Sequence, residues 1–149
     1  MWKLPASERM ARWRAFRNYI DSLPLDQAIQ ETVEFWAKCP FTPFYLEYTD
    51  SDNWPDPWQL INENCYCDLA KCLGIVYTLY LTKHKSSIEF DLQVYREEGT
   101  LNTYNLVNLN QGKYVINLFD NEIVNNTSID EKLTLLHSYN STKLNLEKY

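Results

Sequence analysis

Glycine and histidine are scarce in this chain of 149 residues, which has three glycines and two histidines. It has six prolines and no Gly- or Ser-rich tract, so nothing in the composition resembles a flexible linker. No apolar run approaches the roughly 18 residues of a membrane-spanning helix, and Met1-Trp2-Lys3-Leu4-Pro5 leads into arginines instead of the apolar core of a signal peptide. We therefore predict a single domain, residues 1–149, without export or membrane contact and with reduced cysteines.

Positive charge is also in short supply. The net charge of −6 disfavours nucleic acid as a partner, because phosphate binding needs a basic face. The charge is unevenly placed: residues 1–20 sum to +4, so residues 21–149 sum to −10. A basic N-terminal helix on an acidic body can fold back on that body or dock on a neighbouring molecule.

Aromatic side chains are in excess, at 15% of the chain. Most are expected in the core, but aromatic residues are also enriched at the centres of protein interfaces. Residues 41–57 are rich in aromatic residues and prolines and cannot form a regular helix or a central strand, so this loop either wraps over the core or meets a partner. The basic N-terminal segment and this loop together give the interaction candidates Trp2, Arg9, Arg12, Arg14, Arg17, Trp54 and Trp58.

Apolar residues at spacings of three and four predict the helices. A basic helix lies within residues 1–22, and residues 23–84 hold a second helix that ends near Cys39, a short turn capped by Asp56, and a main helix from about Cys65 to His84. Its one glycine, Gly74, costs a helix about 1 kcal/mol relative to alanine, which predicts close packing against a neighbouring element.

After Ser87 the apolar period becomes two, which is typical of strands. Residues 85–149 are therefore predicted to form an antiparallel sheet, and the tail Lys143–Tyr149, which alternates around Leu144 and Leu146, could add an edge strand. The strands expected before the tail are Ile88–Val94, Leu101–Leu109, Lys113–Phe119, a short one around Ile123, and Lys132–Tyr139. Helices that precede such strands predict an α+β domain, with N-terminal helices packed on a β-meander.

The cysteines could be metal ligands or nucleophiles. The C-x-C-x4-C spacing of Cys65, Cys67 and Cys72 matches no common zinc pattern, even with Cys39 and His84 added, so we expect no metal and no cofactor. A thiol at a helix N-terminus is a better candidate, because the helix dipole stabilises its thiolate. Catalysis would also need a base, and no sequence argument brings His84 or His137 to these cysteines.

The order of a cysteine at the start of a central helix and a following antiparallel sheet resembles the transglutaminase-like (papain-like) cysteine hydrolases. Their nucleophile motif is Gly-Asp-Cys followed by an acidic residue and an alanine, and the matching stretch is Asn64-Cys65-Tyr66-Cys67-Asp68-Leu69-Ala70-Lys71. The family's histidine strand and aspartate strand resemble Tyr104–Leu109 and Gln111–Asn117. The resemblance covers about residues 54 to 124 and implies that fold and activity on amide bonds.

The departures from that family argue against activity. Gly-Asp is missing, and the acidic residue and the alanine are off by one from either cysteine. Tyr104 or Asn105 stands where the histidine belongs and Asn117 where the aspartate belongs, and neither residue type replaces an imidazole base and its carboxylate. The resemblance therefore implies a catalytically inactive version of the fold, with Cys65, Cys67, Tyr104 and Asn117 as vestigial site residues.

A second resemblance is to small proteins of tailed bacteriophages, cyanophages among them. It is carried by Trp2–Arg9 and by Tyr66–Lys71 with the helix that follows. The resemblance itself names no role. Together with the uneven charge, the excess of aromatic residues and the missing histidine and aspartate, it leads us to predict a non-enzymatic component of a tail, baseplate or neck, found in the virion and before assembly in the host cytoplasm, whose partners are other virion proteins or copies of itself. The alternatives are a cysteine-dependent amide hydrolase or transferase and a phage-encoded inhibitor of a host protein.

Overall fold

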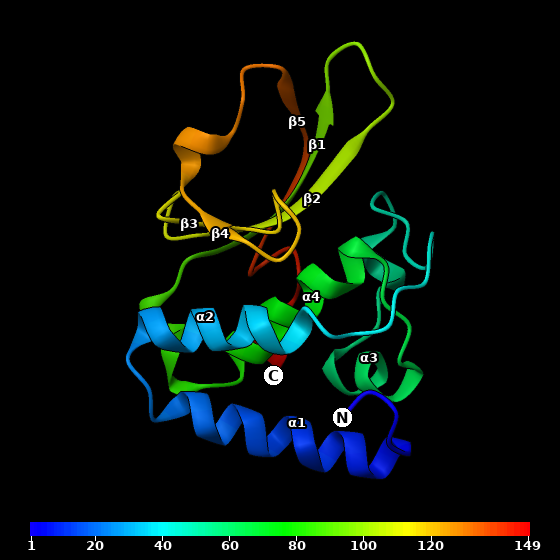
Figure 1. Ribbon diagram of the computed structural model, residues 1–149, viewed down its shortest axis with the longest axis vertical. Coiled ribbons are helices and arrows are strands. Elements are labelled where there is room, and N and C mark those ends of the chain that lie inside the picture. The colour runs from blue at the N-terminus through cyan, green and yellow to red at the C-terminus, as the bar shows by residue number, and fades with distance from the viewer.

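The computed structural model describes residues 1–149, with helices first and an antiparallel sheet after them (Figure 1). The helices are α1 (Ala6–Asp21), α2 (Leu25–Trp36), α3 (Pro57–Glu63) and α4 (Asp68–Tyr80), and the strands are β1 (Phe90–Glu97), β2 (Thr103–Leu109), β3 (Tyr114–Ile116), β4 (Ile123–Val124) and β5 (Leu133–Asn140). Short 3-10 helices are η1 (Ser51–Asn53), η2 (Lys83–Ser87), η3 (Asn126–Ser128) and η4 (Leu146–Lys148). The predicted α+β class is confirmed. No helix combines the length and apolar character needed to cross a membrane.

The central helix α4 lies between α2 and the sheet, while α1 packs on α2 and α3 at the far end from the sheet (Figure 1). Of its 13 residues, 11 are buried, so α4 is covered on all sides. The predicted close packing at Gly74 is confirmed, because a Cβ atom there would lie 2.4 Å from Cη2 of Trp36. Glycine at this position therefore allows α2 and α4 to approach closely.

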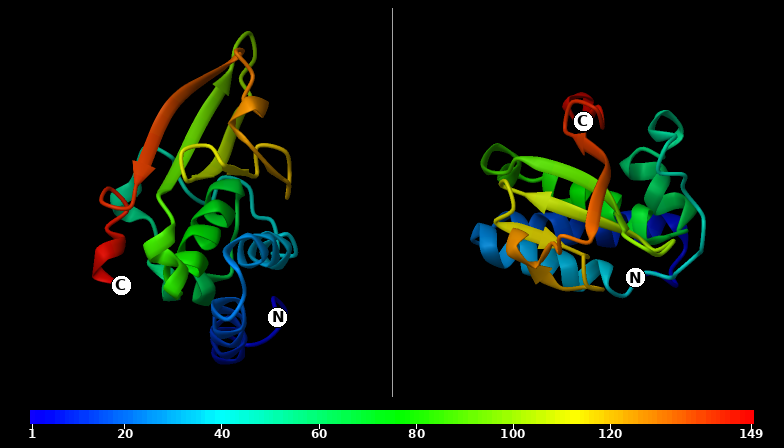
Figure 2. Two further views of the ribbon diagram at one scale, coloured as in Figure 1. Left: turned by 90° about the vertical axis from the view of Figure 1, so that its left-hand side faces the viewer. Right: turned by 90° about the horizontal axis from the view of Figure 1, so that it is seen from above.

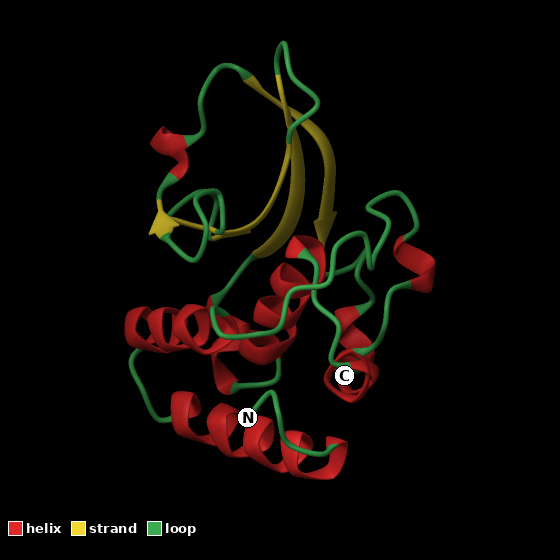
Figure 3. Ribbon diagram, turned by 45° about the vertical axis from the view of Figure 1, so that its right-hand side comes forward, coloured by secondary structure: helices red, strands yellow, loops and turns green.

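The five strands are ordered β4-β3-β2-β1-β5. The first four form a meander, but β5 returns across the sheet to pair with β1 instead of β4 (Figures 2 and 3). One face of the sheet rests on the helices. On the other face the chain between β3 and β5 covers a small apolar cluster of Leu106, Val115 and Leu118.

The main helix is shorter than the predicted range Cys65–His84. It starts only at Asp68 because Tyr66 forms an isolated parallel bridge with Phe41, which keeps the preceding residues extended. It ends at Tyr80, and Thr82 then caps η2 by accepting a hydrogen bond from the backbone N–H of His84.

The strand prediction for the tail is wrong. Asn145 has a left-handed backbone with φ 55°, so the chain turns and continues into η4. Both Leu144 and Leu146 are buried, as an edge strand with both on its inner face would also have them, but here the turn at Asn145 brings them to the core. The third strand also ends early, at Ile116, because Asn117 is left-handed with φ 72°.

Candidate functional site

A cleft of about 520 Å³ lies where α4 begins, beside the start of β2 and the turn between β3 and β4. Half of its lining residues are hydrophobic, so the cleft can hold both apolar and polar groups. The segment between α2 and α3 contributes Ala37, Cys39 and Phe41 to the wall of the cleft. Its lining includes Cys39, Phe41, Tyr66, Cys67, Asp68, Lys71, Tyr104, Asn105, Asn117, Asp120 and Asn121.

The two predicted helix-start cysteines have different positions. Cys67 is the N-cap residue of α4, is 8% exposed and lines the cleft, and its thiol makes no capping hydrogen bond. Cys65 lies in the linker before the helix, where its Sγ donates to the carbonyl oxygen of Glu63 at 3.4 Å, and it is not part of the cleft lining. Only Cys67 is therefore placed at the helix end and the cleft together.

The other two cysteines are held in the protonated form. Cys72, one turn further along α4, is fully buried, and burial raises the pKa of its thiol to about 12. Its Sγ donates to the carbonyl oxygen of Asn105 at 3.3 Å. Burial also raises the pKa of the Cys39 thiol, to about 11. Neither thiol is a nucleophile near neutral pH, since the thiolate is the reactive form.

Tyr104, Asn105 and Asn117, which the sequence resemblance matched to the family's histidine and aspartate, line the same cleft as Cys67. The amide of Asn117 donates to the carbonyl oxygen of Asn105 at 3.0 Å, and its Nδ2 lies 3.6 Å from Sγ of Cys72. The side-chain oxygen of Asn105 is buried and has no hydrogen-bond partner. The structure thus brings the predicted residues together around one cleft, where they present amide and phenol groups.

Both histidines are occupied elsewhere. The Nε2 atom of buried His84 lies 3.0 Å from the carbonyl oxygen of Ile20, which fixes η2 to the end of α1. The ring of His137 on β5 lies near Tyr48 and stacks on Tyr139, with ring centroids 5.4 and 6.1 Å apart. Neither histidine lines the cleft.

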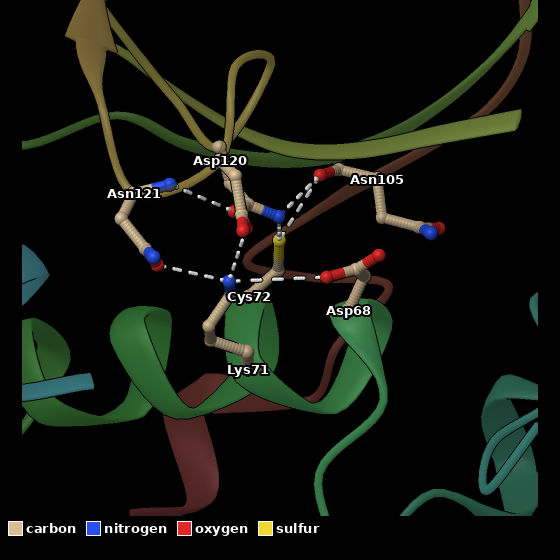
Figure 4. A network of polar contacts seen from close by, with 7 residues as sticks. Asp68, Lys71, Cys72, Asn105, Asp120 and Asn121 are labelled. Atoms are coloured by element: carbon tan, nitrogen blue, oxygen red, sulfur yellow. Dashed lines mark hydrogen bonds and ion pairs between the residues drawn. The ribbon is translucent and has the colours of Figure 1, made fainter. Parts of the chain in front are cut away.

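Sequence reasoning missed the role of Lys71, a residue of the cleft lining that is at the centre of a polar network (Figure 4). Its Nζ atom donates to Oδ1 of Asp120 at 2.9 Å and to Oδ1 of Asn121 at 3.0 Å, and it lies 3.8 Å from the carboxylate of Asp68. This network ties the β3–β4 turn to α4. The spacing of four residues between Cys67 and Lys71 was a signal for a shared helix face, but nothing in the sequence pointed to the turn as its partner.

Several of the predicted interaction residues serve the fold. Arg9 is 8% exposed and donates to the carbonyl oxygens of Leu4, Ile61 and Asn62 at 2.5, 3.2 and 2.9 Å. Three others also make intramolecular contacts: Arg17 lies over the Trp13 ring, Trp2 packs on Trp36, and Trp54 packs on Tyr139. Arg12 and Arg14 are exposed, and Trp58 is 44% exposed beside Tyr149.

The fold of the chain is similar to that of solved structures. The chain is similar to Legionella pneumophila LapG in its calcium-bound form, with a TM-score of 0.74 at 10% identity over 93% of this chain and 78% of LapG. It is also similar to LapG in an EGTA-treated form, with a TM-score of 0.72 at 11% identity over 91% of this chain and 74% of LapG. LapG is a transglutaminase-like cysteine protease. The fold is transglutaminase-like.

At this level of identity the likeness shows the fold alone, and it confirms the transglutaminase-like arrangement expected from the sequence. No protein-family model and no curated protein matches the chain. In the sequence the motif's acidic residue and alanine are off by one from both Cys65 and Cys67, and Tyr66 lies between these two cysteines. Tyr66 is buried, and its hydroxyl donates to the carbonyl oxygen of Leu60 at 3.1 Å.

Proposed function

We propose that this protein is a non-catalytic member of the transglutaminase-like fold that acts through protein–protein contacts and binds a polypeptide segment in its cleft. The observation that carries the proposal is the cleft lining, which holds a helix-capping cysteine, Cys67, but no histidine. A cysteine hydrolase needs a base within hydrogen-bond reach of the thiol and a third group that orients the base.

The residues around Cys67 include no imidazole that could act as the base. Tyr104 and Asn105 are not bases near neutral pH, and the carboxamide of Asn117 cannot stabilise an imidazolium. The ammonium of Lys71 is committed to Asp120 and Asn121, so it acts as a donor and tether. The chemistry of the site is therefore that of recognition.

A polypeptide fits the cleft better than a small charged ligand does. The lining is half apolar, which suits the side chains of a polypeptide. The fold resemblance also implies a cleft shaped around an amide bond, and loss of the catalytic groups leaves such a cleft able to bind without cleaving.

Fluorescein-labelled casein tests the absence of catalysis. Wild-type protein and Cys67→Ser are incubated with it at pH 6–9, and we expect no turnover above the buffer rate for either. Turnover that the wild type shows and Cys67→Ser loses would overturn the proposal.

A cysteine-dependent amide hydrolase or transferase is the second candidate, favoured by the fold likeness to LapG and by the position of Cys67 at the start of α4. It requires a thiolate near neutral pH. The rate of alkylation of Cys67 by iodoacetamide, followed against pH by mass spectrometry, separates the candidates. A midpoint near 8.5, the ordinary value for cysteine, excludes the hydrolase.

The partner's identity is a separate proposal. The sequence favoured a virion protein of a tailed phage, or a second copy of this chain, as the partner. The fold likeness to LapG lends no support to a role in a phage particle. One LapG structure is calcium-bound, but this chain has no group of three or more His, Cys, Asp or Glu residues that could hold a metal ion, so we do not extend calcium binding to it. Cross-linking with mass spectrometry on infected-cell lysate tests the phage proposal.

A further inference from the structure

The strand β2 has an unpaired edge inside the cleft. It pairs with β3 only from Val107 onward, because β3 ends at Ile116. Residues Thr103–Asn105 therefore have no neighbouring strand on that side, and all three of them line the cleft. We call these three residues the open edge of β2. An unpaired strand edge is a template on which another extended chain can form backbone hydrogen bonds.

The pairing of β2 with β1 shows which backbone groups the open edge offers. The backbone N–H of Glu97 donates to the carbonyl oxygen of Asn102 at 3.0 Å, so the backbone groups of Asn102 face β1. Successive residues of a strand direct these groups to opposite edges, which means that Thr103 and Asn105 direct theirs away from β1. The carbonyl oxygen of Asn105 agrees with this assignment, since it accepts from Nδ2 of Asn117 at 3.0 Å. The groups left open are the N–H and carbonyl of Thr103 and the N–H of Asn105.

The open edge has a hollow on each face of the sheet. Tyr104 and Leu118 line the cleft on the helix side, and they also line a second hollow of about 170 Å³. Both side chains belong to the apolar cluster on the face of the sheet opposite the helices, so the second hollow lies on that face. A strand directs alternate side chains to opposite faces. In a strand added at the open edge, one side chain would therefore enter the cleft and the next would enter the second hollow.

The two hollows suit different side chains. Half of the residues that line the second hollow are hydrophobic, among them Phe119, which is 50% exposed, so this hollow suits an apolar side chain. In the cleft the side chains of Asp68 and Asp120 are 53% and 79% exposed, whereas that of Lys71 is 10% exposed. The accessible charge of the cleft is therefore negative and attracts a lysine or arginine.

A flexible segment suits this position better than a folded surface does. The volume of the cleft, about 520 Å³, is in the range of small-ligand sites, so it holds a few residues and not a face of a folded domain. Within residues 1–149 the longest stretch outside the helices and strands, residues 37–56, is itself fixed. The backbone N–H of Thr42 donates to the carbonyl oxygen of Tyr66 at 2.9 Å, and the Trp54 ring packs on Tyr139.

We propose that a flexible segment of a different protein adds as a strand to the open edge of β2, with a lysine or arginine side chain in the cleft and the neighbouring apolar side chain in the second hollow. Backbone hydrogen bonds then provide affinity, and the two hollows provide specificity. This inference rests on the proposed function, and it names the way in which the cleft binds its partner.

The test uses peptides selected on the full chain from a displayed library of random 12-residue sequences. Their dissociation constants are measured by fluorescence anisotropy for wild type, Thr103→Pro and Thr103→Ala. Proline removes the N–H that faces the open edge and leaves the hydrogen bonds to β1 in place, and it is tolerated at the first residue of a strand. Alanine removes the Thr103 side chain and keeps the N–H, so it is the matched control.

We expect Thr103→Pro to weaken binding about tenfold or more, and Thr103→Ala to stay within about twofold of wild type. A second measurement does not depend on the stability of the variants. Each residue of a selected peptide is N-methylated in turn, and binding of wild type should be lost at alternate positions only, because every second N–H of an added strand faces the open edge.

Peptides that bind wild type and Thr103→Pro equally, with no alternation in the N-methyl series, would overturn strand addition and leave the proposed function standing. Selected peptides that are acidic or lack an apolar residue would overturn the assignment of the two hollows. Failure of every selected peptide to bind the wild type in solution would overturn the proposed function as well. Sedimentation velocity tests the source of the segment, since self-association that Thr103→Pro abolishes and Thr103→Ala keeps would identify a second copy as the occupant instead.

Discussion

Trp36 of α2 donates its indole N–H to Oγ1 of Thr78 on α4 at 2.9 Å. The indole N–H of Trp13 of α1 donates to the same oxygen at 3.0 Å. The Thr78 hydroxyl in turn donates a hydrogen bond to the carbonyl oxygen of Gly74 at 2.7 Å. A single buried hydroxyl therefore joins three helices. Both tryptophans are almost fully buried, so neither indole N–H has water as an alternative partner.

Replacement of Thr78 by valine is predicted to be strongly destabilising. Valine keeps the shape but leaves two buried indole N–H groups without an acceptor, at about 1–3 kcal/mol each. We expect the free energy of unfolding in urea to fall by about 2–5 kcal/mol. The matched control is Thr32→Val, because Thr32 is equally buried and bonds back to the carbonyl oxygen of Ala28 at 2.7 Å but accepts from no tryptophan. Equal losses in the two variants would show that the shared acceptor has no special importance.

Arg9 gives a second prediction, because it was expected at an interface and instead joins three carbonyl oxygens of the N-terminal segment and α3. Arg9→Lys keeps the charge but loses the planar fork that reaches several acceptors at once. We expect a loss of about 2–3 kcal/mol in unfolding free energy, since partly buried carbonyl groups lose their donor. Arg12→Lys on the exposed face of α1 should change stability by less than about 0.5 kcal/mol. A similar small effect for Arg9→Lys would return Arg9 to the interaction candidates.

The contrast between Arg9 and Arg12 shows what the sequence could and could not predict. Periodicity located α1, α2 and the first strands, because those signals are local. It did not distinguish the buried arginine from its exposed neighbours, since the three carbonyl acceptors come from segments up to 53 residues away. The same holds for the cleft: Cys67 was found from its place at a helix end, but Lys71 pairs with a turn 49 residues later. The strand prediction for the tail failed for a different reason. The sequence there alternates as in a strand, but Asn145 adopts a left-handed backbone and the chain continues as a 3-10 helix.

Stability is predicted to fall at alkaline pH. Burial raises the pKa of Cys72 to about 12, and it also raises the pKa values of Tyr66 and Tyr77 above their ordinary range. The native state keeps these protons, while the unfolded chain releases the cysteine proton near pH 8.5 and the tyrosine protons near pH 10. The unfolded state thus binds fewer protons above about pH 9, so stability declines as pH rises from there toward 12, by up to about 1.4 kcal/mol per pH unit for each group.

Urea unfolding at pH 7, 9, 10 and 11 measures that decline. Cys72→Ala should flatten the dependence between pH 9 and 11, because it removes one of the buried acids. Cys65→Ala, in the linker outside the core, should leave it unchanged. A wild-type protein as stable at pH 11 as at pH 7 would contradict the assignment of these groups as buried and protonated.

The contact between Lys71 and Asp120 is predicted to order the β3–β4 turn at the edge of the cleft. Lys71→Met keeps the buried stem and removes the donor to Asp120 and Asn121. Because the Asp120 side chain is 79% exposed, the ion pair contributes little to global stability, and we expect a change below about 1 kcal/mol. The local effect should be larger. The backbone N–H of Asn117 donates to the carbonyl oxygen of Glu122 at 3.1 Å across the turn, and it should exchange with solvent about tenfold faster.

Lys113→Met, on the neighbouring β2–β3 turn, is the control and should leave that exchange rate unchanged. Hydrogen–deuterium exchange measured by NMR separates the two results, and equal exchange of Asn117 in wild type and Lys71→Met would mean that the turn is held by its own backbone hydrogen bonds instead.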